Sequence, residues 1–476
     1  MIDTQPGGLW PDEAAEGLSA QRLLTQPGYH PVFFDDDGGR EALFAYLVAA
    51  GFRLAGASVV ILRTTAAIVG VIGVVAIWAM ARRFGRGAAL AAMAWSAGSL
   101  WLICVSRDGM RNVITIAAGA LAVWALLGWG DNPSRKRALL AGAAVGAGLW
   151  TYQPLKLLPL LVLLWLLWMR RVDSRRYRRV QTTVLWSIAA YVVVAAPMIW
   201  TAITDWRTYF GRGASVVVIT PGLSSPESLP VHVLRTIGML VFTGDPNARQ
   251  DVSALPLLGP ILFVLFALGV YRAWQRRTDH SHALLLLGLP VFLLPPLLAR
   301  EGYSPHFLRA LGLAPFIAAL VGLGCVELAA ACGRASARFN AGTADALRRS
   351  AAAALAAVLL LLGIASTSAY VGRPLIERYD AFTFATVALA AAAAGGPGNA
   401  VIVDGYSAFD VRFLDADDLP TLVEPGRHVK DPAVYALIVA QSRGDIATAT
   451  DDATAARASV VARDPQGKPV VFEVVP

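Results

Sequence analysis

The chain has 476 residues, of which 56% are hydrophobic and only 16% are charged, and its formal net charge is +8. Soluble globular domains carry roughly 25% charged residues, so this composition excludes an ordinary soluble protein and indicates a membrane protein. Continuously apolar runs such as 154–169 and 351–364 exclude a membrane β-barrel, whose strands alternate. The basic excess lies in short connections between these runs, which favours a role in membrane topology over nucleic-acid binding.

The first sixty residues are acidic and lack the apolar core of a signal peptide. Pro11, Asp12 and Glu13 precede AAEGLSAQRLL, a pattern typical of a helix start, because proline fits the first turn and acidic side chains favour the positive end of the helix dipole. On this pattern alone, a helix start is a better interpretation of Asp12-Glu13 than catalysis. The run DDDGG at 35–39 predicts a solvated turn.

Ten apolar segments follow that predict membrane-spanning helices. They cover residues 60–82, 88–105, 110–129, 138–151, 154–170, 181–203, 255–274, 282–299, 307–330 and 350–370. The fourth and fifth segments are short and meet at TYQPLK, residues 151–156, where Pro154 interrupts the helix. We therefore expect a tight helical hairpin there.

The distribution of Lys and Arg predicts the orientation of these spans. One alternating set of connections holds 19 Lys and Arg, whereas the other set holds 9 although it is longer. The first set therefore faces the cytoplasm; it comprises residues 81–87, 129–138, 170–179, 272–282 and 333–349. The N-terminal segment, the 151–156 turn, the 204–254 connection and the tail after residue 370 are then expected outside a plasma membrane.

Residues 371–476 predict a separate soluble domain. The stretch 399–406 is typical of a buried strand, 431–444 has helical spacing and a glycine stop, and VVFEVVP ends the chain like a strand. The predicted fold is an all-α polytopic membrane protein with a small C-terminal extracytoplasmic α/β domain. The predicted parts are an extracytoplasmic first loop (1–59), a multi-span domain (60–370) and the soluble domain (371–476).

Several ionisable residues lie at the predicted outward ends of spans, where such groups usually face a cavity or a partner. Snorkelling to the interface is the alternative explanation. Arginines at the outer face are the less expected ones, because Lys and Arg are concentrated in the cytoplasmic connections. Guanidinium groups bind phosphate bidentately. With the acidic pair on the same side, these residues favour chemistry on a lipid-linked phosphate. They are Arg107, Asp108, Arg111, Lys156, Arg300, Glu301, His306 and Arg309.

The sequence identifies no cofactor. The DHSH stretch at 279–282 falls in a cytoplasmic connection without further ligands, so we predict no metal site there. The three cysteines, Cys104, Cys325 and Cys332, lie in or beside apolar runs and predict neither a disulfide framework nor a metal centre. A divalent cation remains possible but has no support in the sequence.

An ordered set of segments resembles a known family, the C-type (GT-C) polyprenyl-phosphate-dependent glycosyltransferases of the protein O-mannosyltransferase and aminoarabinose transferase type. The resemblance extends over about residues 7–330. The segments are GLWPDEAAEGLSAQRLL with its Asp-Glu pair, GREALFAYLVAAGFRLAG (39–56), LRTTAAIVGVIGVVAIWAMARRFG (62–85), SRDGMRN (106–112), GAAVGAGLWTYQPLKLLPLL (142–161) and HFLRALGLAPFIAAL (306–320).

The resemblance implies transfer of a sugar from a polyprenyl-phosphate donor in the bilayer, with inversion, to a glycan, glycolipid or protein acceptor at the outer face, and no nucleic-acid partner. It implies that Asp12 is the catalytic base, with Glu13 as a second catalytic carboxylate. The implied substrate-binding residues are Glu41, Arg107, Arg111, Tyr152, Lys156, His306 and Arg309. Given the resemblance, a catalytic Asp12 becomes the better interpretation.

The sequence departs from the family pattern at one point, and two alternative functions are left open. The family has a transmembrane helix before the Asp-Glu loop, whereas here that loop begins near Met1, so we expect the natural start to lie upstream. A lipid or solute transporter would also have many spans, but with broken helices or repeat symmetry, neither of which the sequence indicates. A non-catalytic membrane scaffold would tolerate loss of Asp12. The sugar, the acceptor and the lipid chain length are left open.

Overall fold

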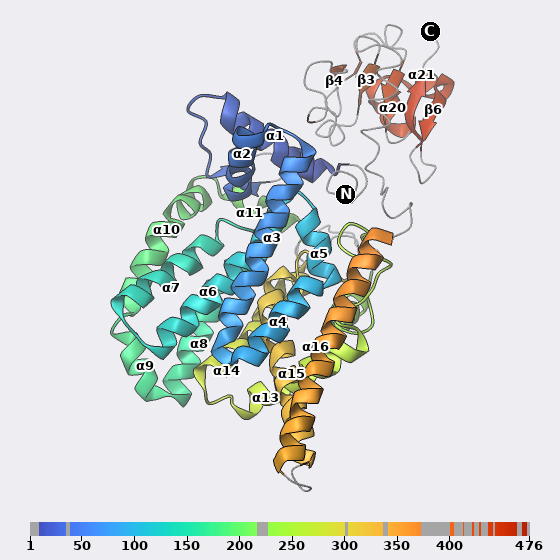
Figure 1. Cartoon of the computed structure of the whole chain (residues 1–476). Helices are drawn as coiled ribbons and strands as arrows, with labels where there is room; N and C mark the ends of the chain where they lie inside the picture. Colours follow the sequence, from blue (N-terminus) through green and yellow to red (C-terminus); the bar gives the residue numbers. More distant parts are fainter. Residues whose placement is uncertain are drawn as a thin grey trace.

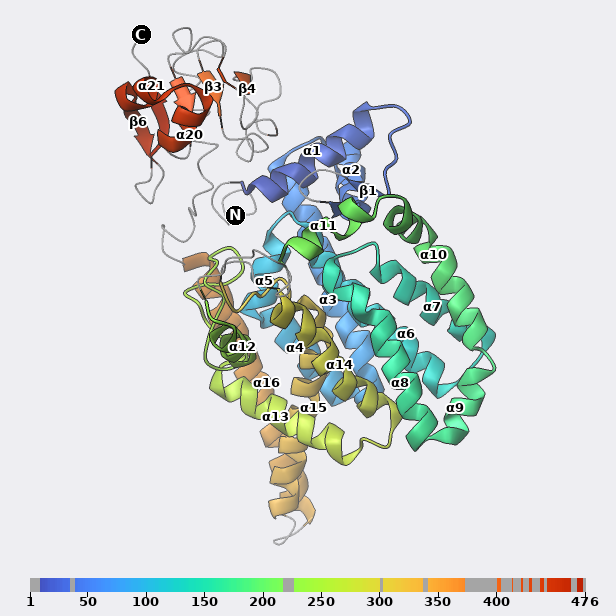
Figure 2. The same cartoon turned by 180° about the vertical axis from the view of Figure 1, so that it is seen from behind.

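The computed structural model is a helical bundle with a smaller strand-containing region near the N-terminal segment (Figures 1 and 2). It describes residues 9–34, 39–216, 227–299, 303–336, 341–372, 400–403, 413, 421–422, 428–429, 437–440, 443–463 and 469–473. The site considered below lies at the end of the bundle that the N-terminal segment covers.

The N-terminal segment folds into two packed helices, α1 (Pro11–Thr25) and α2 (Leu43–Ala55), joined through a two-stranded antiparallel ribbon, β1 (Phe33–Phe34) and β2 (Arg40–Glu41). The helix predicted after Pro11 is therefore present. Proline occupies its first turn, and the Trp10 N–H donates a 3.1 Å hydrogen bond to the Glu13 carboxylate. This contact satisfies an amide at the helix start, where intrahelical partners are missing.

Each of the ten predicted spans contains a helix. They are α3 (Val59–Ala81), α4 (Arg86–Gly98) with α5 (Leu100–Arg107), α6 (Ile114–Asp131), α7 (Arg135–Gly148), α8 (Leu158–Val172), α10 (Val184–Thr204), α13 (Gly259–Gln275), α14 (His280–Leu298), α15 (Ala314–Ser336) and α16 (Ala341–Gly372). In the described part of the chain, six helical stretches are long and apolar enough to cross a membrane, or seven with the α4–α5 pair. A helix of 14 residues such as α7 rises only about 21 Å, less than the roughly 30 Å hydrocarbon core. The number of ten membrane crossings therefore stays a prediction.

The span predicted at 88–105 is not continuous. It breaks between α4 and α5 with a bend of 57°, and Ser99 at the break is extended, with φ −72° and ψ 120°. No proline interrupts this segment, but a Gly-Ser pair, Gly98-Ser99, stands at the break, and such pairs are one of the usual causes of sharp kinks in helices.

Short 3-10 turns begin three of the long helices at the end that faces the N-terminal segment. They are η2 (Arg111–Val113) before α6, η3 (Gln153–Leu157) before α8 and η4 (Leu311–Leu313) before α15. Turn η3 lies in the connection from α7 to α8, at the position of the predicted hairpin. The remaining connections contain η1 (Arg82–Phe84), α9 (Ser174–Gln181), α11 (Trp206–Val216) and α12 (Leu229–Gly238).

Helix α15 lies in the middle of the bundle, where backbones approach closely. A Cβ on Gly269 of α13 would lie 1.8 Å from the Leu320 carbonyl oxygen, and one on Gly324 would lie 1.7 Å from that of Leu265. Glycine is therefore required on both helices of the α13–α15 contact, since no side chain fits between them.

The described residues near the C-terminus form a five-stranded mixed sheet in the order β4-β3-β5-β7-β6. Strand β3 is parallel to β4 and β5, whereas β7 is antiparallel to β5 and β6. The elements are β3 (Ala400–Ile402), β4 (Thr421–Leu422), β5 (Leu437–Val439), α20 (Arg443–Ala449), α21 (Asp452–Arg457), β6 (Ser459–Arg463) and β7 (Pro469–Glu473).

The helix predicted over 431–444 is wrong at residues 437–439, which form β5. Pairing with β3 on one side and β7 on the other overrides the local helical spacing, as tertiary contacts commonly do. Residues 430–436 lie outside the described part. The predicted strands near 400 and 470 coincide with β3 and β7. The domain boundary at 371 and the extracytoplasmic side remain predictions.

Candidate active site

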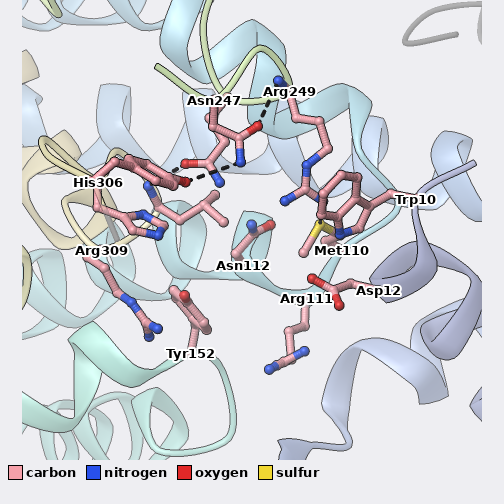
Figure 3. Close-up of a pocket in the computed structure, with 13 residues that line it drawn as sticks. Trp10, Asp12, Met110, Arg111, Asn112, Tyr152, Asn247, Arg249, His306 and Arg309 are labelled. Carbon is pink, nitrogen blue, oxygen red and sulfur yellow. Dashed lines mark hydrogen bonds between the residues drawn. The ribbon is translucent and has the colours of Figure 1, made fainter. Parts of the chain in front are cut away.

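A cavity of about 310 Å³ opens where the start of α1, turn η2, the start of η3 and two loops converge (Figure 3). Segments more than 200 residues apart in sequence thus share one wall. Among its lining residues are the sequence-predicted Asp12, Arg111, Tyr152, His306 and Arg309. The remaining lining residues are Trp10, Met110, Asn112, Asn247, Arg249, Gln250, Tyr303 and Leu308.

The cavity has an excess of positive charge. Three arginines line it, Arg111, Arg249 and Arg309, together with one carboxylate, that of Asp12. Asp12 lies in the first turn of α1 and is 8% exposed. Figure 3 shows its carboxylate near Arg111 and Met110. Beside the cavity, Arg111 also pairs with Glu16 and Glu41. The three guanidinium groups in the lining suit an anionic ligand, because guanidinium groups bind phosphate in a fixed, bidentate geometry.

Glu13, the predicted second catalytic carboxylate, does not line this cavity. Its oxygens accept hydrogen bonds from Arg63 Nε at 2.9 Å, Arg63 Nη2 at 2.8 Å and the Gly109 N–H at 2.6 Å, as well as from Trp10. Burial raises the pKa of Glu13, but Arg63 and these backbone donors outweigh it and hold the pKa below 4.5. Glu13 is therefore an ionised anchor that fixes the turn carrying Asp12.

Glu41 lies just outside the cavity and contacts two of the predicted cations, Arg111 and Lys156. One oxygen accepts from Arg111 Nε at 3.3 Å, and the other lies 3.1 Å from Lys156 Nζ. Lys156 also lies 4.2 Å from the centre of the Tyr209 ring. Burial and the neighbouring Glu41 charge raise the pKa of Tyr209 to about 12, so this phenol stays protonated beside the lysine. Glu41 thus positions Arg111 and does not itself line the cavity.

Two residues in this network were not singled out from the sequence, Glu16 and Arg40. Glu16 Oε1 lies 3.0 Å from Arg111 Nη1 and 3.4 Å from Arg40 Nη1, and Arg40 also donates to the Ser19 hydroxyl at 3.0 Å. Glu16 follows Asp12 by one helical turn, so the same face of α1 supplies both. That spacing was the only signal in the sequence for its role.

Tyr152 separates the two predicted phosphate-binding arginines. The centre of its ring is 5.8 Å from the Arg111 guanidinium carbon and 5.7 Å from that of Arg309. Arg309 also donates to the Gln153 side-chain oxygen at 2.7 Å. The aromatic ring therefore stabilises two cations in one wall, and it holds them apart by the width of a side chain.

The loop around residue 247 supplies lining residues that the sequence did not reveal. Arg249 lies over the Trp10 ring with 3.1 Å between its guanidinium carbon and the ring centre. Asn247 donates to the Tyr303 hydroxyl at 3.2 Å, and the Tyr303 ring stacks on His306 with 5.1 Å between centres. Arg249 was counted only as one of the outward cations, because nothing in its local sequence marks a site.

Asp245 ties this loop to the segment before α15. Its two oxygens accept hydrogen bonds from the Asn247 and Phe307 backbone amides, both at 2.7–2.8 Å. Burial raises its pKa although these amides, His306 and Arg249 act in the opposite direction. The contacts fix His306, next to Phe307, in the cavity wall.

Asn112 is a further lining residue missed from the sequence. It is 1% exposed, and in the described part of the chain neither atom of its side-chain amide has a hydrogen-bond partner. Figure 3 shows it in the middle of the cavity, between Tyr152 and Arg249. Buried polar groups are nearly always hydrogen-bonded in native proteins, so this amide is a candidate to bind a group that enters the cavity.

The other predicted residues lie elsewhere. Arg107 does not line the cavity, and its guanidinium carbon lies 5.9 Å from the centre of the Tyr370 ring. Asp108 is buried in the next position and does not line the cavity either. Arg300 and Glu301 lie outside the described residues. In the DHSH stretch, residues 279–282, His280 Nε2 lies 2.9 Å from Asp131. No group of three potential metal ligands occurs among the described residues.

Comparison with known proteins bears on this fold and this cavity. Residues 41–200 match the family model of dolichyl-phosphate-mannose-protein mannosyltransferases. The structure is also similar to two crystal structures of ArnT from Cupriavidus metallidurans. The apo form gives a TM-score of 0.64 and the form bound to undecaprenyl phosphate 0.66, each at 14% identity over 99% of this chain and 94% of the other.

The resemblance to the C-type glycosyltransferases is confirmed. The family match begins at Glu41 and includes η2 and η3, and the fold shared with ArnT extends over 99% of this chain. No curated protein matches the chain by sequence. Two of the turns that border the cavity, η2 and η3, therefore lie inside the segment that matches the family model.

Proposed function

We propose that the chain is a membrane glycosyltransferase that moves a sugar from a polyprenyl-phosphate donor to an acceptor at the outer membrane face. The observation that carries the proposal is the cavity itself, which is lined by one carboxylate, that of Asp12, and by three arginines. The mannosyltransferase family match and the ArnT structure bound to undecaprenyl phosphate support a lipid-phosphate donor.

In the proposed reaction, the donor phosphate lies near Arg111 and Arg309, and its polyprenyl chain lies in the bilayer. Asp12 accepts the proton of an acceptor hydroxyl or amine while the acceptor atom attacks the anomeric carbon. The bond from that carbon to the phosphate oxygen breaks, and polyprenyl phosphate leaves with the electron pair. Attack opposite the leaving group inverts the anomeric centre. Fixed cations stabilise the charge that develops on the phosphate.

The neutral amide of Asn112 suits the sugar better than the phosphate. A side-chain amide has both donors and an acceptor, whereas an ionised phosphate offers only acceptors. A sugar hydroxyl satisfies both atoms of the amide, because it donates one hydrogen bond and accepts another. Asn112 is therefore assigned to a hydroxyl of the transferred sugar, and the arginines to the phosphate.

The test is transfer of radiolabelled sugar from polyprenyl-phosphate donors in membranes that contain the chain. Asp12→Asn should lower transfer by about a hundred- to ten-thousand-fold, the usual contribution of a positioned base, without loss of folded protein. Asp205→Asn is the matched control, because Asp205 is an exposed acidic residue at the start of α11 and asparagine also caps helices well. Undiminished transfer by Asp12→Asn would remove Asp12 from the reaction.

The bend between α4 and α5 favours one competing function, a lipid transporter, because transporters use discontinuous helices. A transporter should move polyprenyl phosphate between leaflets of a liposome without transferring sugar. Movement without transfer, by chain that is folded, would support the transporter. A scaffold would show neither activity.

A further inference from the structure

A second, apolar groove of about 700 Å³ lies between α4, α15 and α16. Figures 1 and 2 both show these three helices next to one another. Only 6% of the most apolar window of α16 is buried inside the chain, so the outer side of this groove faces the bilayer. Its lining is mostly alanine, glycine and aliphatic residues, with Arg348 and Arg349 at one end.

The groove arises because α4 and α16 touch at one end and diverge at the other. A Cβ on Gly98 would lie 2.6 Å from the Gly363 Cα, so the two backbones are in contact there. Toward the opposite ends, Gly87 and Arg348 both border the groove. Small side chains such as Ala356 line it and leave the space between the diverging helices unfilled.

The wide end of the groove carries net positive charge. Arg348 and Arg349 lie near the start of α16 and share one acidic partner, Asp345, at 2.8 and 2.7 Å. The single Asp345 carboxylate neutralises only one of the two arginine charges, so one positive charge remains. This end lies opposite the candidate active site, because α4 begins here and leads through α5 to cavity residue Met110. The charge bias of the connections places it on the cytoplasmic side.

From the apolar groove and the cationic end we infer that this surface binds an anionic glycerophospholipid of the inner leaflet. One acyl chain lies between α4 and α16, and the phosphodiester lies at Arg348 and Arg349. Basic pockets between membrane helices on the cytoplasmic side are suited to anionic headgroups. A zwitterionic lipid would bring its own cation to the two arginines and would bind less well. The inference does not depend on the proposed glycosyl transfer.

The test uses the full chain in nanodiscs, with phosphatidylglycerol or phosphatidylcholine as the probe and native mass spectrometry as the measurement. Wild type should retain phosphatidylglycerol selectively. Arg348→Gln with Arg349→Gln should weaken this retention by about 10- to 30-fold, the loss expected for two cations near a charged lipid. The matched control is Arg170→Gln with Arg171→Gln, an exposed arginine pair at the end of α8, which should retain the lipid fully.

A second pair of variants tests the apolar half of the groove. Ala356→Phe fills the groove and should abolish retention, whereas Leu360→Phe changes an exposed position on the same helix and should not. If Ala356→Phe fails to fold, the arginine variant decides, because it leaves the packing intact. Three outcomes would each overturn the inference. All variants could retain phosphatidylglycerol equally, wild type could retain phosphatidylcholine as well as phosphatidylglycerol, or polyprenyl phosphate could displace the bound lipid.

Discussion

Asn112→Leu should make the protein more stable and less active. Both atoms of the Asn112 amide are buried without a partner in the described part of the chain, and an unsatisfied buried group costs about 1–3 kcal/mol. Leucine is similar in size and has no polar atoms, so the free energy of unfolding should rise by about 1–3 kcal/mol. If the amide makes two hydrogen bonds to the sugar, their loss should lower kcat/KM by about 5- to 150-fold.

The opposite signs of the two effects make this prediction specific. Thermal unfolding of the purified protein without donor measures the first effect, and transfer of radiolabelled sugar measures the second. Thr115→Val is the matched control. The Thr115 hydroxyl is fully buried and also has no partner among the described residues, but Thr115 does not line the cavity. This control should gain stability and keep its activity.

A deoxy-sugar donor gives an independent check. Loss of the hydroxyl from the donor should lower the kcat/KM of the wild type by about the same factor as the Asn112→Leu substitution lowers it with the normal donor. The variant itself should discriminate little between the two donors. Unchanged transfer by Asn112→Leu, with donor and protein otherwise competent, would refute the assignment of this amide to the sugar. A loss of stability would show that the amide has a protein partner in the folded state.

Four further predictions concern the charges around the cavity and the topology. Arg63→Met should lower the free energy of unfolding by about 3–5 kcal/mol, because it leaves the Glu13 carboxylate buried without its ion pair; a shift in denaturant midpoint measures this, and a loss below 1 kcal/mol would contradict the burial argument. The pKa of Glu13 is lower in the folded than in the unfolded protein, so its stabilisation is present above about pH 4.5 and lost as the pH falls through the folded pKa; Glu13→Gln should flatten the acid limb of a stability profile, and an unchanged limb would argue against the shift. Arg309→Ala should weaken binding of the phosphate donor, and an unchanged affinity would mean that Arg309 does not contact the phosphate. Protease-accessible tags at residues 175 and 430 should report the first inside and the second outside; the reverse would invert the predicted topology.

The long helices could be predicted from sequence because each depends on a local property, a continuous apolar run. The C-type resemblance pointed to residues that the fold brings together, because Asp12, Arg111 and Arg309 line one cavity. The break between α4 and α5 was missed because the apolar run continues through it, although Gly98-Ser99 is a local signal for a kink. The strand at 437–439 was missed for a different reason, because pairing with β3 and β7 defines it.

The site was only half predictable because its partners are distant in sequence. Adjacent carboxylates, Asp12 and Glu13, looked equivalent in the chain, yet one faces the cavity and the other pairs with Arg63, fifty residues away. Asn112 was missed because an unsatisfied amide is a property of burial and not of residue type. Arg249 was missed because its partner, Trp10, lies far away in the sequence, near the start of the chain.

The buried charges also determine how the site can open. Glu13 joins α1 to Arg63 of α3, and Glu16 joins the same helix to Arg111 of η2. Moving α1 away from the bundle would separate these buried ion pairs, and breaking one such pair costs about 3–5 kcal/mol. The loop around Asn247 contacts the residue before α1 through the Arg249 guanidinium and the Trp10 ring, a contact worth about 0.5–2 kcal/mol. The ion pairs of Glu13 and Glu16 should therefore keep α1 and Asp12 fixed when an acceptor enters from outside, so the proposed base keeps its position as the acceptor arrives.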